Sequence, residues 1–134
     1  MSARTIDFDD EYKWGTANNN YSQRPYCEII VWYNKTPFRV WCIVDSGADR
    51  LQLDTAIAHQ LGIPLNNATI KNVQMANGSF TKYQLVKDID LEIEGEKIKT
   101  DVLFATGIPP LLGRSAFLKA ITIGIDNSGW LYKV

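Results

Sequence analysis

The stretch that organises the chain reads Ile43-Val44-Asp45-Ser46-Gly47-Ala48-Asp49-Arg50. An apolar, strand-like run from Trp41 to Val44 precedes the acid. It ends in an acid, a hydroxyl and a glycine, which predicts a strand that leads into a tight polar turn. Two interpretations stay open at this point. The stretch is either an ordinary strand end, because these residue types commonly form turns, or a loop that presents Asp45 as a catalytic carboxylate.

Length and charge narrow the class of protein. The chain has 134 residues and a net charge of -1, so we expect one domain with a real core. Its basic residues are scattered, which argues against a nucleic-acid partner. The apolar runs are far shorter than the roughly 20 residues that span a bilayer, and no signal peptide is visible. We therefore expect no membrane partner and a cytoplasmic location.

The pattern of apolar residues divides the chain into an arm and a domain. Residues 1–24 are polar and rich in Asp and Asn, and we expect a loosely ordered arm with one short strand near residues 5–8. From residue 25 to residue 134, short alternating runs separated by turn residues predict an all-β domain. The predicted strands lie near 27–33, 38–44, 50–54, 70–76, 80–87, 89–94, 97–104, 121–125 and 130–134.

Two segments favour helices. Residues 55–61 follow Asp54 or Thr55 as N-cap and end at Gly62. Residues 115–119 form the second candidate. His59, the only histidine, lies off the buried stripe of the first helix, so we expect it on the surface. A triad of Ser46 and His59 with an aspartate lacks the GxSxG motif and is disfavoured.

Cys27 and Cys42 are the only cysteines, and no Cys/His cluster has the spacing of a zinc site. We therefore expect no metal and no cofactor. If residues 27–33 and 38–44 form a hairpin that turns at Asn34-Lys35, the register places Cys27 opposite Cys42. A cross-strand disulfide is conceivable, but without a secretion signal we favour two reduced, packed thiols.

A second hairpin is predicted between residues 72 and 83. Asn77-Gly78 is a strong signal for a two-residue type I′ turn, which needs a positive φ at both central positions. The hairpin is either an ordinary surface feature or a mobile lid that folds over an extended ligand.

A third motif, Leu111-Leu112-Gly113-Arg114, opens the second helix. Its glycine lets two backbones approach closely, because glycine has no Cβ. The three stretches follow one another as an apolar strand into Asp-Ser-Gly-Ala-Asp, a hairpin with Ala-Asn-Gly, and Leu-Leu-Gly-Arg. In this order, over roughly residues 26–125, the chain resembles the retropepsin-like aspartic proteases, the single-domain family of retroviruses, retrotransposons and cellular relatives.

The resemblance implies a role for each matching residue. Asp45 matches the catalytic aspartate, Ser46 the hydroxyl residue after it, and Gly47 and Ala48 the rest of the active-site loop. Leu111, Leu112 and Gly113 match the apolar pair and glycine that pack beneath this loop, and Asp49 with Arg114 matches an ion pair that ties loop to helix. Residues 73–83 take the place of the flap. The expected substrate contacts are Ala48 and Asp49 on the loop and Val73, Met75, Ala76, Asn77, Gly78, Phe80 and Tyr83 on the hairpin.

The resemblance also implies two chains. Peptide hydrolysis by an aspartic protease needs two carboxylates, and the nearest second motif, Asp126-Asn127-Ser128-Gly129, is interrupted by Asn. We therefore expect an aspartic endopeptidase that acts on polypeptides as a homodimer, with one Asp45 from each subunit. A peptide-binding module without catalysis remains an alternative. A purely structural β-domain is a weaker one, because the coincidence of Asp49 with Arg114 argues against it.

Overall fold

The computed structural model describes residues 6–8, 10–11, 13–14, 24–126 and 129–134. Its strands are β1 (Asp10–Glu11), β2 (Lys13–Trp14), β3 (Pro25–Tyr33), β4 (Thr36–Val44), β5 (Leu51–Asp54), β6 (Thr69–Gln74), β7 (Phe80–Ile93), β8 (Glu96–Ala105), β9 (Leu111–Leu112), β10 (Thr122–Asp126) and β11 (Gly129–Lys133). Its helices are α1 (Thr55–Leu61) and α2 (Arg114–Phe117).

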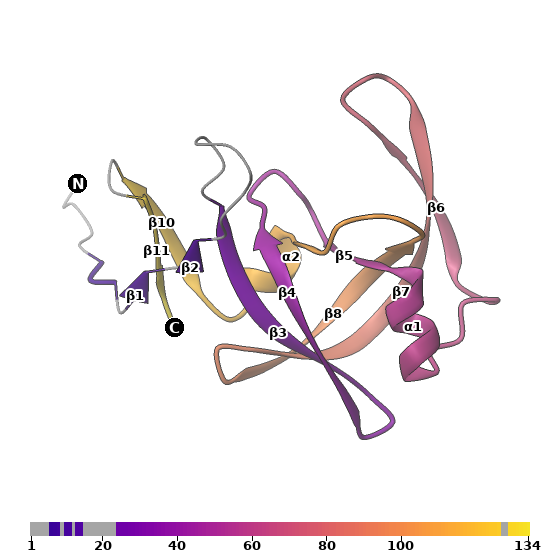
Figure 1. The fold of residues 1–134 in the computed structure, drawn as a ribbon, viewed down its shortest axis with the longest axis horizontal. Helices are drawn as coiled ribbons and strands as arrows, with labels where there is room; N and C mark the ends of the chain where they lie inside the picture. Colours follow the sequence, from indigo (N-terminus) through magenta and orange to yellow (C-terminus); the bar gives the residue numbers. More distant parts are fainter. Residues whose placement is uncertain (1–5, 9, 12, 15–23, 127–128) are drawn as a thin grey trace, which may run out of the picture.

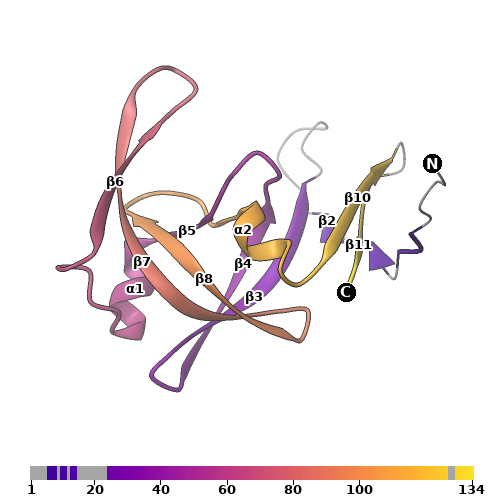
Figure 2. The same ribbon diagram turned by 180° about the vertical axis from the view of Figure 1, so that it is seen from behind.

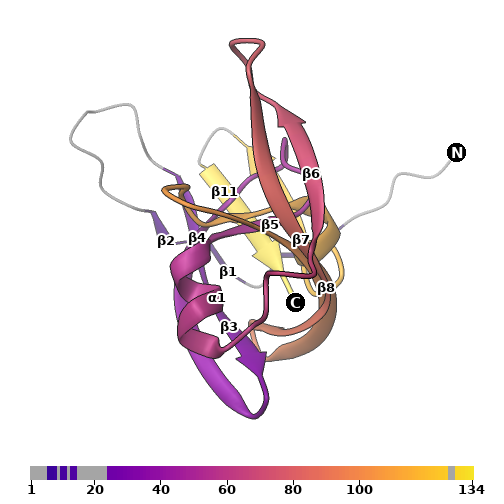
Figure 3. The same ribbon diagram turned by 90° about the vertical axis from the view of Figure 1, so that its right-hand side faces the viewer.

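The larger of two sheets closes on itself to form a barrel. Its strand order is β2-β3-β4-β9-β5-β8-β7-β6, and β3 pairs with β7 as well as with β4. Strands β2 and β6 lie outside the closed ring, and β6 and β7 extend from the barrel as a long hairpin (Figures 1 and 3). The predicted all-β architecture, a barrel with a protruding hairpin and two short helices, is confirmed.

The core fills the barrel because the strands alternate between buried and exposed residues. Along β3, for example, Cys27, Ile29 and Val31 are buried while their neighbours are partly exposed. The largest fully buried side chains include Phe104 on β8 and Phe117 on α2. Helix α2 therefore closes one end of the same core that the strands form.

The β3–β4 hairpin turns at Asn34-Lys35, as predicted. Both residues have positive φ, 46° and 65°, which is the geometry of a type I′ turn. The register pairs Cys27 with Cys42, and both are buried, free thiols. Burial, together with the nearby Glu94 and Glu28 carboxylates, raises the pKa of Cys27 to about 12. Two reduced, packed thiols are therefore confirmed.

One strand replaces two that the sequence predicted. Residues 80–87 and 89–94 belong to a single strand, β7, which is interrupted by an irregularity between Val86 and Ile89. Asp88 has a φ of 58° at this point. A local bulge of this kind places a polar residue with turn geometry inside the strand. The sequence pattern at this residue therefore predicts the end of one strand and the start of another.

Helix α1 has the predicted caps. The Asp54 carboxylate accepts a hydrogen bond from the Ala56 N–H at 2.9 Å, and Gly62 ends the helix with a φ of 76°. Ala58 and Leu61 are buried, whereas His59 is exposed, as expected.

The two chain ends meet in a smaller sheet of order β1-β11-β10. Figure 2 shows this sheet beside the barrel. The strand expected near residues 5–8 is absent from residues 6–8, and residue 5 lies outside the described residues. Instead β1 pairs with β11, and β2 pairs with β3. The boundary at residue 24 stays a prediction, although two strands before it pair with strands after it.

Candidate active site

Asp45 follows β4 directly, and its backbone is held by a strand far away in the sequence. Strands β4 and β9 run parallel and pair Val44 with Leu112. The pairing continues beyond the strand, because the Asp45 N–H donates to the Leu112 carbonyl at 3.0 Å. Two residues before Asp45, the Ile43 N–H donates to the Pro110 carbonyl at 3.1 Å in the same way. The position of the acid is therefore set by the β9 backbone.

The loop after Asp45 folds back on the acid. The Gly47 N–H donates to Asp45 Oδ1 at 2.9 Å, and the Ala48 N–H donates to the Asp45 carbonyl at 3.2 Å. Asp45 is partly exposed, and Ser46 and Gly47 are exposed. Among the described groups, Gly47 is the only hydrogen-bond donor to this carboxylate. The loop thus presents a fixed carboxylate that a ligand can reach.

Arg114, the first residue of α2, ties the helix to the loop. Its Nη1 donates to the Ser46 carbonyl at 2.7 Å, and its Nη2 forms an ion pair with the Asp49 carboxylate. Two backbone bonds support this link, from the Arg114 N–H to the Ala48 carbonyl and from the Ser115 N–H to the Asp49 carbonyl, each at 2.9 Å. The two residues that the resemblance pairs are therefore in contact.

Gly113 lies where the loop and the helix touch. A Cβ at this position would lie 2.3 Å from the Arg50 carbonyl oxygen, well inside any real contact. The φ of Gly113 is -85°, so the requirement is for space and not for an unusual backbone conformation. Beside it, Leu112 is fully buried and Leu111 is partly buried. The close backbone approach expected from this glycine is present.

The β6–β7 hairpin has a different tip from the one predicted. Its last strand pair is Gln74 with Phe80, and the Met75 N–H donates to the Ser79 carbonyl at 2.7 Å. Only Gly78, with a φ of 86°, takes the left-handed conformation, so the predicted type I′ turn at Asn77-Gly78 is wrong. The tip is a three-residue loop in which Gly78 alone needs positive φ. Asn77 instead caps the turn, because its Oδ1 accepts a bond from the Ser79 N–H at 3.0 Å.

Two exposed apolar residues, Met75 and Phe80, lie at the tip of the hairpin, and a third, Ile70, is 55% exposed near its base. Phe80 and Met75 are 66% and 41% exposed, while Val73 is partly buried. Tyr83, expected to contact substrate, is instead buried at the base of the hairpin, where its hydroxyl donates to Gln52 Oε1 at 3.4 Å. Ala76, Asn77 and Gly78 are exposed.

Gln52 was not among the predicted site residues. Its Nε2 donates to the Pro109 carbonyl at 3.1 Å, so the side chain joins the base of the hairpin to the segment before β9. The available signal was its position between buried Leu51 and Leu53, because alternation along a strand turns Gln52 to the opposite face.

The loop and its supports thus come together within one chain, but the hairpin tip stays apart from them. No hydrogen bond joins residues 75–79 to residues 45–50 in the described structure. In Figures 1 and 2 the hairpin and the β4–β5 loop project from the same side of the barrel. The arrangement leaves the carboxylate open on the side that the hairpin could cover.

Comparison with known families identifies this arrangement. Residues 29–116 match the model of a family described as aspartyl protease. The chain belongs to the aspartyl protease family. The match spans the Asp45 loop, the hairpin and Gly113, and it places this aspartyl protease in the retropepsin-like clan of peptide hydrolases, as predicted. No curated protein matches the chain.

Two further observations concern other kinds of site. Neither helix in the described part of the chain has the length and apolar character needed to cross a membrane. Within the same residues, no group of three or more His, Cys, Asp or Glu side chains is arranged to hold a metal ion.

Proposed function

We propose that this aspartyl protease is an endopeptidase that forms its active site from two identical subunits. The observation that carries the proposal is the accessible Asp45 carboxylate, which is held in a loop that is fixed by Leu112 and Arg114. Hydrolysis requires one carboxylate to take a proton from water and another to donate one to the substrate carbonyl. Because the chain provides one such loop, the second carboxylate is Asp45 of a partner subunit.

Two carboxylates at hydrogen-bond distance cannot both ionise easily, so the pair retains one shared proton over a wide pH range. In this scheme Gly47 donates to the carboxylate from its backbone, and the Ser46 hydroxyl bonds across the two-fold axis and braces the loop. Arg114 is a positioning residue, because it acts through the Ser46 carbonyl and Asp49.

The substrate is proposed to be a polypeptide that binds as an extended strand across the paired loops. The hairpin provides the cover, with Met75 and Phe80 as the exposed apolar contacts and Val73 behind them. Backbone groups of residues 76–78 at the tip and residues 48–49 of the loop are within the segments that face the same side of the barrel (Figure 1). A cover of this kind must open for substrate to enter.

The small terminal sheet offers a surface for the second subunit. Strand β10 is its edge, so one side of its backbone has no paired strand among the described residues. Ile125 on this strand is 62% exposed. An exposed edge strand can pair with a copy of itself about a two-fold axis, which is the commonest oligomer symmetry. The arm of residues 1–24 is proposed to contribute to this region through β1.

Cleavage of a diverse peptide library tests the proposal. The protein is incubated at acidic and neutral pH with and without a pepstatin-like inhibitor, beside Asp45→Asn and the control Asp90→Asn, which removes an exposed carboxylate from a distant ion pair. We expect product peaks from wild type and Asp90→Asn but none from Asp45→Asn. Cleavage by Asp45→Asn would disprove the mechanism.

Mass in solution tests the dimer separately. We expect wild type and Asp45→Asn to have the same dimeric mass at micromolar concentration, since the substitution removes a charge without changing the shape of the loop. A strictly monomeric protein that cleaves peptides would contradict a shared active site. A dimer that binds peptides without cutting them would instead support a binding module.

A further inference from the structure

The free part of the β6–β7 hairpin begins at Tyr83. Within the barrel, β7 pairs with β8 as far as Gln84, which lies opposite Phe104. Beyond this pair, residues 80–83 of β7 pair only with β6 in the described structure. Tyr83 is therefore the first residue of β7 outside the barrel sheet, and it lies at the base of the free hairpin.

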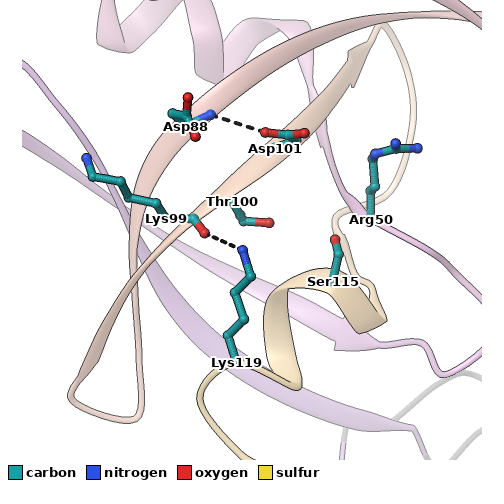
Figure 4. A pocket seen from close by; sticks show the side chains of 7 residues that line it. All are labelled: Arg50, Asp88, Lys99, Thr100, Asp101, Ser115 and Lys119. Carbon is teal, nitrogen blue, oxygen red and sulfur yellow. Dashed lines mark hydrogen bonds between the residues drawn. The ribbon is translucent and has the colours of Figure 1, made fainter.

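The bulge farther along β7 is tied to the neighbouring strand. The Asp88 N–H donates to Asp101 Oδ1 on β8 at 3.2 Å, and Figure 4 shows this bond as a dashed line. Pairing with β8 resumes at Ile89 and continues to Ile93. Segments with few bonds to the rest of the fold are the ones that move. We therefore expect the hairpin to move about its base at Tyr83 and not about the bulge.

A side-chain hydrogen bond joins this base to Gln52 on β5. The Tyr83 hydroxyl donates to Gln52 Oε1 at 3.4 Å, which is long for a hydrogen bond. The Tyr83 ring is buried and packs in a small apolar cluster with Leu85, Leu103 and Ala105. A buried tyrosine hydroxyl usually has a hydrogen-bond partner, and Gln52 provides it here.

The other end of the Gln52 amide bonds to the segment before β9. Its Nε2 donates to the Pro109 carbonyl at 3.1 Å, a shorter bond than the one to Tyr83. A carbonyl oxygen can only accept, so this bond turns the amide nitrogen toward Pro109 and leaves the amide oxygen for Tyr83. The link therefore needs a donor at one end of the side chain and an acceptor at the other.

The segment that Gln52 holds is the one that positions Asp45. The Pro110 carbonyl, one residue after Pro109, accepts the Ile43 N–H at 3.1 Å. The Leu112 carbonyl accepts the Asp45 N–H at 3.0 Å. A displacement of Pro109 would therefore disturb the backbone bonds that fix the acid.

We propose that Gln52 is a positioning residue that keeps the base of the hairpin in register with the Asp45 loop. It acts through Tyr83 on the hairpin and through Pro109 on the backbone that holds Asp45. A cover that moves about this base closes over a carboxylate whose position is set by the same link. The effect on turnover rests on the proposed function, whereas the link itself is testable without catalysis.

Gln52→Glu in the full chain is the sharpest test, because it keeps the shape of the side chain and changes only its hydrogen bonding. An ionised carboxylate cannot donate to the Pro109 carbonyl, whereas a protonated one can. Since a glutamate titrates near about pH 4.3, the link is broken at pH 7 and is largely restored at pH 4. Amide hydrogen exchange, corrected for the intrinsic rate at each pH, reports the result. We expect protection of the Ile43 and Asp45 amides to fall at least about tenfold at pH 7 but less than about threefold at pH 4.

Gln84→Glu is the matched control. Gln84 also lies on β7 and donates through Nε2 to a backbone carbonyl, that of Leu65, at 2.9 Å. Its bond leads to the segment after α1 and not to Pro109. Once the change in the free energy of unfolding of each variant has been subtracted, this control should leave the protection of Ile43 and Asp45 at the wild-type level.

Peptide turnover separates positioning from direct contact with substrate. At pH 7 we expect Gln52→Glu to lower kcat at least about fivefold while KM stays within about twofold of wild type. Relative to wild type at the same pH, kcat should recover at pH 4. A higher KM with an unchanged kcat would show that Gln52 contacts substrate, which contradicts a role through Pro109.

The proposal is overturned if Gln52→Glu keeps wild-type protection at pH 7, if its loss persists at pH 4, or if Gln84→Glu causes the same loss. Wild type that cleaves no peptide would contradict the proposed function, and amide exchange would still decide on the link. Should Gln52→Glu fail to fold, Tyr83→Phe decides, because it removes only the hydroxyl. We expect this variant to increase NMR relaxation dispersion at the amides of residues 75–79, and unchanged dispersion would overturn the proposal.

Discussion

The Asp45 loop and the tip of the β6–β7 hairpin lie on the same side of the barrel but are held in opposite ways. Residues 45–50 are bound by partners far away in the sequence, such as the Arg114 bond to the Ser46 carbonyl across 68 positions. Residues 75–79 bond only among themselves in the described structure. One region is fixed by the fold and the other only by its own turn.

This difference matches what the two regions are proposed to do. A catalytic carboxylate has to be placed accurately before substrate arrives, which requires support from rigid elements. A cover has to move, and mobile segments have few buried contacts and exposed backbone hydrogen bonds. The following substitutions test the contrast, from the largest expected effect to the smallest.

Gly113→Ala should have the largest effect, because the new Cβ would collide with the Arg50 backbone at 2.3 Å. We expect the free energy of unfolding to fall by about 3 kcal/mol or more, or the chain to misfold. Chemical denaturation measures the change. Gly47→Ala is the comparison within the same loop, because its Cβ would meet only Asp45 Oδ1, at 3.2 Å. Equal losses for both variants would mean that the close backbone approach is not what fixes the loop.

Arg114→Gln should reduce the free energy of unfolding by about 1 kcal/mol, since it removes a charge-assisted bond to the Ser46 carbonyl and the Asp49 ion pair at an exposed site. Arg39→Gln, which breaks an exposed pair with Glu28, should cost no more than about 0.5 kcal/mol. Urea denaturation compares the two. If they cost the same, the bond to the loop contributes no more than a surface ion pair.

Cys27 on β3, the strand that pairs with the one leading to Asp45, should also make stability depend on alkaline pH. Burial raises the pKa of Cys27 from 9.0 to about 12, so the folded chain keeps a proton that the unfolded chain loses above pH 9. This contribution is complete below pH 9 and is lost between pH 9 and about 12. By pH 10 we expect Cys27 to account for about 1 kcal/mol of lost stability.

The contribution of Cys27 to the free energy of unfolding can be separated from that of other titrating groups. The measurement is denaturation of wild type and Cys27→Ala at pH 8 and pH 10 under reducing conditions. The variant should lose less stability over that interval than wild type does. Parallel losses would show that the thiol is not shielded in the folded chain.

Phe80→Ala should have the smallest effect on folding. The side chain is 66% exposed at the hairpin tip, so the free energy of unfolding should change by less than about 0.5 kcal/mol. Peptide turnover, in contrast, should fall if this ring contacts substrate. Leu85→Ala at the buried base of the same hairpin is the comparison and should cost about 2 kcal/mol or more. A Phe80→Ala protein that keeps full turnover would remove this residue from the proposed cleft.

Local pattern was sufficient wherever neighbouring residues decide the structure. The Asn34-Lys35 hairpin, the register of Cys27 with Cys42 and the caps of α1 all follow from short-range rules. The Asp45 loop and Gly113 were located by the order of three motifs. That order also indicated the ion pair between Asp49 and Arg114, which no local pattern contains.

The sequence-based predictions failed where the structure is determined by contacts between distant segments or by a single φ angle. The Asn77-Gly78 signal was strong, but the neighbouring Ser79 gave the Asn77 side chain a local partner, and the tip formed a three-residue loop. The pairing of β1 with β11 depends on contacts across the whole chain, which residues 10–11 do not reveal. Gln52 looked like an ordinary strand residue, because its partners come from Tyr83 and Pro109.

The parallel pairing of β4 with β9 also has a consequence for the order of folding. The hairpin can form as soon as residues 69–85 have been synthesised, because its contacts are local. The Asp45 loop can be held in place only after Leu112, Arg114 and Ser115 have been synthesised. Bringing these residues to the loop closes a long segment of chain, which carries an entropic cost. A nascent chain would therefore have the proposed cover before the Asp45 loop is assembled, and we expect a ribosome-bound fragment that ends before residue 112 to cleave no peptide.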